Sequence, residues 1–127
     1  MKKINVSAEH SYDVLIGEFD IDHLKPLLKD CSKVALLYPS EISGMVDQIS
    51  AEWDLSVELI MIELPEGESQ KSSEVLIEIW NTLSEHNFSR TDWIIGIGGG
   101  ATTDLAGFAA ASWLRGVNWV SVPTSVA

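Results

Sequence analysis

Three predominantly apolar runs constrain the fold of this chain more than any other feature of its sequence. The runs are Lys33–Tyr38, Val57–Leu64 and Asp92–Gly96, and each one ends at proline or at glycines. They lack the strict alternation of a half-exposed strand, so we interpret them as strands covered on both faces. Such strands are typical of parallel sheets, in which crossover connections place helices over both faces.

Helical patterns alternate with these strands, as crossover connections require. The clearest helix is predicted at Gln70–His86, where Val75, Ile79 and Leu83 recur at helical spacing. The other expected elements are strands at Tyr12–Ile16 and Trp119–Val122 and helices at Asp20–Leu28, Glu41–Trp53 and Thr102–Leu114. This order predicts an α/β fold with a mainly parallel sheet flanked by helices.

Composition and charge narrow the class of protein. The 127 residues fit one domain, and 46% apolar residues suffice for a core. The formal net charge of −11 disfavours nucleic acid and anionic membrane surfaces as partners. Cys31 is the only cysteine, so neither an internal disulfide nor a cysteine metal cluster can form. The N-terminus lacks the apolar run of a signal peptide, and we expect a cytoplasmic location.

Charged residues are unevenly distributed along the chain. No acidic residue follows Asp104, and Arg115 is the only charged residue beyond it. The apolar run in this part is too short to span a bilayer. Because the sequence also ends without the polar tail that usually closes a domain, we expect it to be the front part of a longer protein.

A glycine-rich run, Gly96-Ile97-Gly98-Gly99-Gly100-Ala101, lies between the third apolar strand and the last helix. It satisfies the pattern G-x-G-x-x-G/A, in which glycines let the backbone approach a phosphate and the following helix offers unpaired N–H groups. It lies on a late strand, however, and no acidic residue follows about 20 positions later, as the usual dinucleotide fingerprint requires. A tight turn with close packing explains the glycines alone equally well.

Asp104 follows the glycines and the pair Thr102-Thr103. An isolated acid at this position is best explained as a cap of the first helical turn. Beside a glycine turn, the same carboxylate can also accept hydrogen bonds from the hydroxyl groups of a ligand. Three glycines, two capping threonines and a first-turn acid together favour a ligand site.

Three stretches are specific enough to compare with a family: GGGATTDLAGFAAASWLRG at residues 98–116, VPTS at 122–125 and PEGESQKS at 65–72. They closely resemble 3-dehydroquinate synthase, the phosphate-eliminating lyase of the shikimate pathway of aromatic amino acid biosynthesis. The resemblance implies that residues 1–127 form a Rossmann-like NAD-binding domain. It also implies a C-terminal, metal-binding helical domain that is absent from this chain.

The resemblance assigns roles to individual residues. The NAD-binding residues that it implies are Glu68, Lys71, Gly99, Gly100, Asp104, Thr124 and Ser125. Gly99 and Gly100 match the turn that binds the pyrophosphate. Arg115 matches an arginine that reaches the substrate phosphate of the partner subunit. Without the family match, Lys71 is better explained as an exposed partner of Glu68, and Arg115 equally well as a cation at a helix C-terminus.

The metal ligands and the catalytic lysines of the family match no residue of this chain. His10, His23 and His86 match none of these ligands, and we expect all three to be solvated. A divalent metal, zinc or cobalt, is therefore expected to bind outside residues 1–127, and the chain alone is expected to be inactive. Where many members have Asp or Asn near the ribose, this chain has Pro39-Ser40-Glu41, which makes Glu41 the candidate replacement.

The resemblance implies that a homodimer converts 3-deoxy-D-arabino-heptulosonate 7-phosphate to 3-dehydroquinate and phosphate. In that reaction NAD takes a hydride from an alcohol, phosphate leaves by β-elimination, and the hydride returns before the ring recloses. Two alternatives remain open. One is the NAD domain of a related sugar-phosphate cyclase or of a metal-dependent polyol dehydrogenase, and the other is a truncated module that binds a nucleotide without catalysis.

Overall fold

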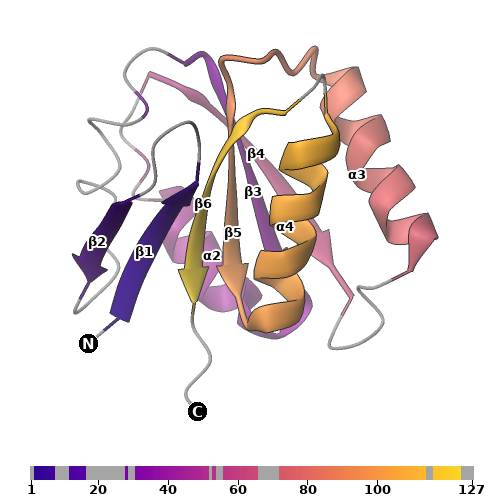
Figure 1. The fold of residues 1–127 in the computed structure, drawn as a ribbon. Helices are drawn as coiled ribbons and strands as arrows, with labels where there is room; N and C mark the ends of the chain where they lie inside the picture. Colours follow the sequence, from indigo (N-terminus) through magenta and orange to yellow (C-terminus); the bar gives the residue numbers. More distant parts are fainter. Residues whose placement is uncertain are drawn as a thin grey trace.

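Six strands form one sheet, in the order β2-β1-β6-β5-β3-β4 (Figure 1). The computed structural model describes residues 2–7, 12–16, 28, 31–51, 53, 56–65, 72–113 and 116–123. The strands are β1 (Lys2–Ser7), β2 (Tyr12–Ile16), β3 (Lys33–Pro39), β4 (Glu58–Leu64), β5 (Trp93–Gly98) and β6 (Asn118–Pro123). Strands β3 to β6 run parallel, whereas β1 pairs antiparallel with β2 and β6. The fold is therefore α/β and Rossmann-like, as the sequence predicts.

Helices cover both faces of the parallel strands. They are α2 (Ser43–Ala51), which follows the short 3-10 helix η2 (Ser40–Ile42), α3 (Ser73–Glu85) and α4 (Gly100–Ser112). Figure 1 shows α2 behind the sheet and α4 in front of it. Ser72 is the N-cap residue of α3, and its Oγ accepts a hydrogen bond of 3.2 Å from the Val75 N–H, which satisfies one donor of the first turn.

The core has two layers, one on each face of the sheet. Along β3 the side chains alternate, with Val34, Leu36 and Tyr38 in the layer below α2. Ala35 and Leu37 point the other way, into the layer beneath α3 and α4. Successive residues of a strand face opposite sides, so a continuous apolar run supplies both layers at once. This is the physical reason why β3 and β5 are apolar at nearly every position.

The predicted elements are confirmed wherever the structure describes them, with shifted ends. The strand expected to end at Gly96 continues to Gly98, and the helix expected to start at Thr102 starts at Gly100. The helix predicted at Glu41–Trp53 is divided into η2 and α2. Strand β1 was not predicted, because Lys2–Ser7 lacks a clear apolar period. The predicted helix at Asp20–Leu28 lies outside the described residues, apart from Leu28.

A buried carboxylate joins β3, β5 and the turn before β5 at the amino end of the sheet. Asp92 is fully buried, and its Oδ1 accepts hydrogen bonds from the backbone N–H of Ser32 at 3.1 Å and of Lys33 at 3.0 Å. Its Oδ2 accepts one from the Ser89 N–H at 2.8 Å. The Ser32 and Ser89 hydroxyls each add a bond of 3.1 Å. Five donors therefore satisfy this one side chain.

These hydrogen bonds also set the ionisation of Asp92. Burial by itself would raise the pKa of the carboxyl group, because it removes water from the charged form. The hydrogen bonds from Ser89, Lys33 and Ser32 outweigh that effect and hold the pKa of Asp92 below its usual value of 3.8. Asp92 is therefore a charged, structural residue at neutral pH.

Candidate functional site at the carboxyl edge of the sheet

The direction of chain winding reverses between β3 and β5. From β3 the chain continues to β4 on one side, returns to β5 on the other side, and then proceeds outward to β6. Leu37 pairs with Gly96, and Gly98 pairs with Pro123, so β3, β5 and β6 end at the same edge. In open α/β sheets, ligands bind outside the carboxyl ends of the strands at such a reversal.

The turn from β5 into α4 lies at this reversal and requires glycine at position 98. Gly98 has a φ of +154°, which other residues rarely adopt. A Cβ built on it would lie 2.8 Å from Oγ1 of Thr102, which is too short for real atoms, and 3.0 Å from Cδ of Pro39, which is an unusually tight contact. Gly100 differs, because a Cβ there would meet nothing within 4 Å. The space in front of Gly100 is therefore open.

Helix α4 approaches the sheet closely beneath this turn. A Cβ on Gly96 would lie 2.6 Å from Cβ of Ala106, and a Cβ on Gly107 would lie 2.9 Å from the ring of Trp119. Both contacts depend on the absence of a side chain on glycine. The alternative of a tight, closely packed turn is thus correct for Gly96 and Gly98, whereas it does not explain the open space at Gly100.

Helix α4 begins at this turn without a side-chain cap. Gly99 is the N-cap residue and carries no side chain that could accept from the first turn. The prediction that Thr102 and Thr103 cap the helix is wrong, since both lie inside it. Thr103 Oγ1 instead donates within the helix to the carbonyl oxygens of Gly99 at 3.3 Å and Gly100 at 3.2 Å. An uncapped helix N-terminus presents unpaired N–H donors and a positive dipole end, which suit an anion.

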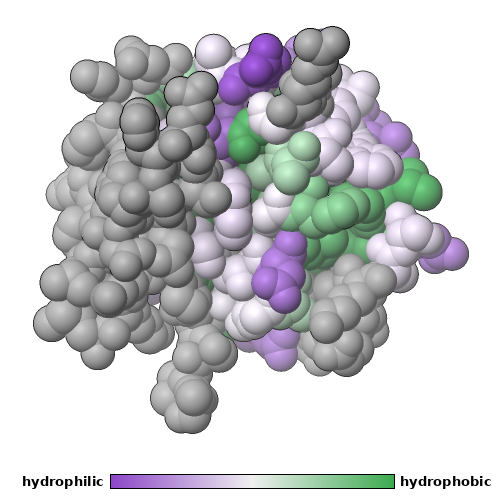
Figure 2. Space-filling model, viewed as in Figure 1, coloured by the Kyte–Doolittle hydropathy of each residue, from purple (hydrophilic) through white to green (hydrophobic). Residues whose placement is uncertain are grey.

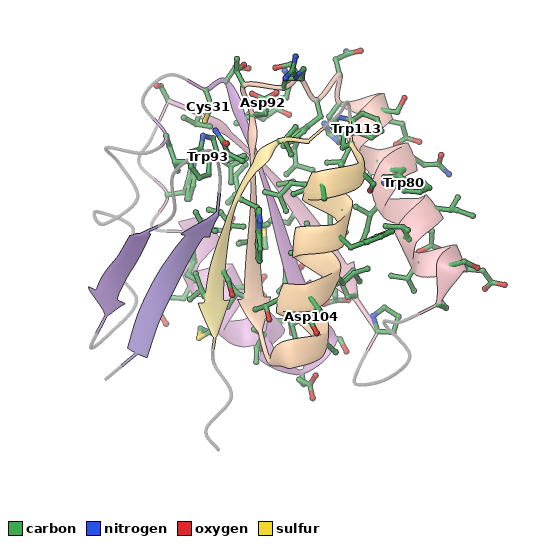
Figure 3. All side chains as sticks on the ribbon, in the orientation of Figure 1. Cys31, Trp80, Asp92, Trp93, Asp104 and Trp113 are labelled. Carbon is green, nitrogen blue, oxygen red and sulfur yellow. The ribbon has the colours of Figure 1, made fainter. Side chains whose placement is uncertain are left out.

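Asp104 lies one turn further into α4 than the sequence predicts. The helix begins at Gly100, so its first turn contains no acidic residue, and Asp104 is in the second turn. The interpretation of Asp104 as an N-terminal cap is therefore wrong. Its side chain is exposed near the end of α4 that adjoins the glycine turn (Figure 3). A carboxylate in this position is free to accept hydrogen bonds from outside the protein.

Several residues named from the sequence fall outside the part of the chain that the structure describes. These residues are Glu68, Lys71, Arg115, Thr124 and Ser125, together with His10 and His23. Their flanking elements are described: β4 ends at Leu64, α3 begins at Ser73 and β6 ends at Pro123. Glu41 is described and exposed, in η2 directly after β3. It therefore follows the strand that ends beside the glycine turn.

Within the described residues, no group of three His, Cys, Asp or Glu side chains could hold a metal ion. His86 is partly exposed at the end of α3, and its Nδ1 lies 3.3 Å from a carboxylate oxygen of Glu58. The expectation that His86 is solvated agrees with this position. A search of the same residues also finds no helix long and apolar enough to cross a membrane.

Two features of this edge could not be assigned from the sequence. Thr102 is 1% exposed and packs against Gly98, although its position in a polar Thr-Thr pair gave no sign of burial. Tyr38, near the end of β3, is also buried, and burial together with the charges of Glu63 and Asp47 raises the pKa of its hydroxyl. Tyr38 therefore remains neutral across the physiological pH range.

Comparison with known proteins gives a consistent family. Residues 61–127 match a family model described as 3-dehydroquinate synthase N-terminal. A 3-dehydroquinate synthase of Streptomyces avermitilis is 42% identical over 117 residues, which cover 91% of this chain and 32% of that protein. The synthase of Streptomyces coelicolor is 43% identical over 124 residues, covering 94% of this chain and 34% of its own length. The chain thus spans about a third of these relatives.

Solved structures show the same fold. A crystal structure of 2-deoxy-scyllo-inosose synthase has a TM-score of 0.80 at 20% identity, covering 98% of this chain and 36% of that one. The same kind of enzyme complexed with carbaglucose-6-phosphate, NAD+ and Co2+ has a TM-score of 0.80 at 19% identity, with 98% and 35% covered. ValA, a 2-epi-5-epi-valiolone synthase of Streptomyces hygroscopicus with NAD+ and Zn2+ bound, has a TM-score of 0.59 at 22% identity, with 72% and 26% covered.

Proposed function

The chain belongs to the 3-dehydroquinate synthase N-terminal family, and from this we propose that it is the NAD-binding part of a 3-dehydroquinate synthase. Residues 1–127 form the NAD-binding domain in this proposal. The enzyme would convert 3-deoxy-D-arabino-heptulosonate 7-phosphate to 3-dehydroquinate and phosphate in the shikimate pathway. The observation that carries the proposal is the open glycine turn at the reversal of chain winding, followed by an uncapped helix.

The geometry of the turn fits a pyrophosphate. Gly100 leaves open space in front of the backbone, and the first amides of α4 supply donors with a positive dipole behind them. We assign the pyrophosphate to Gly99 and Gly100. Asp104, exposed near the same end of the helix, accepts hydrogen bonds from cofactor hydroxyl groups, and Glu41 does the same for the ribose beyond β3.

The remaining roles rest on the family motif. Glu68 and Lys71, which precede α3, and Thr124 and Ser125, which follow β6, complete the contacts to NAD in this proposal. All four flank elements of the parallel sheet. Arg115 binds the phosphate of the substrate in the partner subunit, a task that suits the planar fork of a guanidinium group.

Bound NAD supplies a temporary hydride acceptor for a secondary alcohol of the sugar phosphate. The task of this chain is to fix the position of the cofactor, since small displacements of reacting groups cost large factors in rate. From the family motif we also propose that the divalent metal of this enzyme is bound outside residues 1–127. We therefore propose that residues 1–127 alone do not turn over substrate.

A homodimer is the proposed assembly, and the outer surface of α3 and α4 supports it. Phe108 is 57% exposed and Ile77 is 49% exposed. Figure 2 shows a hydrophobic area where these two helices meet the solvent. Asp104 is the only charged residue of α4. Exposed apolar surface of this kind is typical of an interface, and Arg115 lies three residues after the end of α4 in the sequence.

A related sugar-phosphate cyclase is the second candidate, because two solved structures that share this fold are 2-deoxy-scyllo-inosose synthases. Identity separates the two candidates. The chain is 42% and 43% identical to two 3-dehydroquinate synthases, compared with 19–22% to the cyclases. The synthase is therefore the function that we propose.

Calorimetric titration with NAD tests the proposal. The full chain should bind NAD, and Asp104→Ala should weaken binding about tenfold, the loss of a hydrogen bond to a charged group. Glu78→Ala, an exposed acidic residue of α3, is the matched control and should bind like the parent protein. The assignment of Asp104 is wrong if its variant keeps the parental affinity. If the parent protein does not bind NAD, the cofactor assignment itself is wrong.

A further inference from the structure

The glycine turn has a buried support that no family motif assigns. Thr102 is the third residue of α4, and its side chain is 1% exposed although its neighbours Thr103 and Ala101 are half-buried. The space next to the Gly98 Cα, where any other residue would carry its Cβ, is occupied by Oγ1 and Cβ of Thr102. Helix α4 is therefore in direct side-chain contact with the end of β5.

A second strand completes this packing. Cδ of Pro39 would lie 3.0 Å from a Cβ on Gly98, and Oγ1 of Thr102 would lie 2.8 Å from it. The backbone of Gly98 is thus enclosed between the last residue of β3 and the first turn of α4. Both β3 and β5 end at the reversal of chain winding, so the contact fixes the two strand ends relative to the helix at the place where a ligand is expected.

We propose that Thr102 is a positioning residue that holds the Gly98–Gly100 turn in the shape that binds pyrophosphate. The inference rests on the proposed function, because the ligand is the pyrophosphate of NAD. Thr102 does not touch the ligand itself. Its Oγ1 fills the space beneath the turn, so that the Gly99 and Gly100 amides stay at a fixed height above the sheet.

Two substitutions at position 102 distinguish the contribution of the hydroxyl group from that of the methyl group. Thr102→Ser keeps Oγ1 and Cβ, which are the two atoms nearest to Gly98, whereas Thr102→Ala keeps only Cβ. With Oγ1 absent, the turn can relax toward the sheet. Small displacements of a binding group lower the affinity for the ligand by large factors. Thr102→Ala should therefore raise the dissociation constant for NAD about tenfold, and Thr102→Ser should stay within about twofold of the parent protein.

A control must distinguish a general loss of protein stability from a displacement of the Gly98–Gly100 turn. Ile79→Val removes one methyl group from a fully buried residue of α3 in the same core layer, and it serves as the destabilised control. This control should bind NAD like the parent protein. The inference is overturned if Ile79→Val weakens NAD binding as much as Thr102→Ala, if Thr102→Ala binds normally, or if Thr102→Ser binds as poorly as Thr102→Ala.

A ligand-free measurement distinguishes this inference from the cofactor assignment. In amide NMR spectra, Thr102→Ala should shift the Gly99 and Gly100 resonances and speed their hydrogen exchange, whereas Thr102→Ser and Ile79→Val should leave them near their parental values. Unchanged Gly99 and Gly100 amides in Thr102→Ala overturn the positioning of the turn. If these amides respond as expected but the parent protein binds no NAD, the proposed cofactor is wrong while Thr102 still positions the turn.

Discussion

The two edges of the parallel sheet treat their polar groups in opposite ways. At the amino edge, the carboxylate of Asp92 is fully buried and accepts five hydrogen bonds from Ser32, Lys33 and Ser89. At the carboxyl edge, the turn after β5 has no side-chain cap and open space in front of Gly100. At the amino edge a side chain satisfies the backbone donors, whereas at the carboxyl edge we assign the Gly99 and Gly100 amides to a ligand.

This difference indicates where in the fold a ligand site should be sought. Asp92 has a lowered pKa, and perturbed pKa values often mark active sites, yet its hydrogen-bond partners are groups that fix the ends of β3 and β5. The glycine turn has no titratable residue in its first helical turn. A binding site that uses backbone amides is therefore found through packing and topology, and not through perturbed ionisation.

The largest expected effect is on stability at the amino edge. Asp92→Ala leaves the partly buried N–H groups of Ser32, Lys33 and Ser89 without their acceptor. At about 1–3 kcal/mol for each unsatisfied donor, reduced by water that enters, we expect a loss of about 3–5 kcal/mol. Urea denaturation followed by circular dichroism measures it, and the folded fraction should retain its affinity for NAD. A loss below about 1 kcal/mol would show that the hydrogen bonds of Asp92 contribute little to stability.

Acidic pH should remove the stabilising effect of Asp92 at the amino edge. The pKa of Asp92 is lower in the folded state than in the unfolded state, so its stabilising effect is fully present above the unfolded value of about 3.9. The effect is lost as the pH falls through the folded pKa. The free energy of unfolding of the parent protein should therefore fall more steeply below about pH 4 than that of Asp92→Asn. Parallel pH profiles of the two proteins would contradict this assignment.

Two glycine substitutions at the carboxyl edge give the next effects. Gly98→Ala places a Cβ against Thr102 and Pro39 at a positive φ, and should cost about 1–3 kcal/mol of stability and also weaken NAD binding. Gly100→Ala meets no atom and should gain about 0.5 kcal/mol, because alanine favours the helix. Its methyl group nevertheless occupies the space assigned to pyrophosphate, so NAD affinity should fall.

Thermal denaturation and calorimetry on these two variants together test the assignment. Gly100→Ala should weaken NAD binding without loss of stability, whereas Gly98→Ala should lower both. A Gly100→Ala variant with parental affinity for NAD would show that the pyrophosphate does not lie in front of this residue.

The central strands of the parallel sheet could be predicted from the sequence, because β3 and β5 are buried on both faces and are therefore apolar at nearly every position. The run Lys33–Tyr38 matches β3 within one residue. Strand β1 could not be predicted, because pairing with β2 and β6 holds Lys2–Ser7 in the sheet. The sequence of a short segment does not show such pairing partners. The ends of α4 were misplaced for a related reason: three glycines do not indicate which of them starts a helix.

The candidate site was predictable in part. The position of Gly99 and Gly100 at a strand-to-helix turn follows from the sequence and is observed. The role of Thr102 could not be foreseen, because its burial results from the contact between α4 and the end of β5. The shift of Asp104 to the second turn of α4 has the same origin as the misplaced helix start.

Amide NMR spectra of the full chain, recorded with increasing NAD, test the central claim most directly. Because both edges are observed in one experiment, each serves as the control for the other. The amides of Gly99, Gly100 and Ala101 should shift with saturation, while those of Ser32, Lys33 and Ser89 around Asp92 should not. Saturable shifts that leave Gly99–Ala101 unchanged, or that centre on the Asp92 edge, would contradict the central claim.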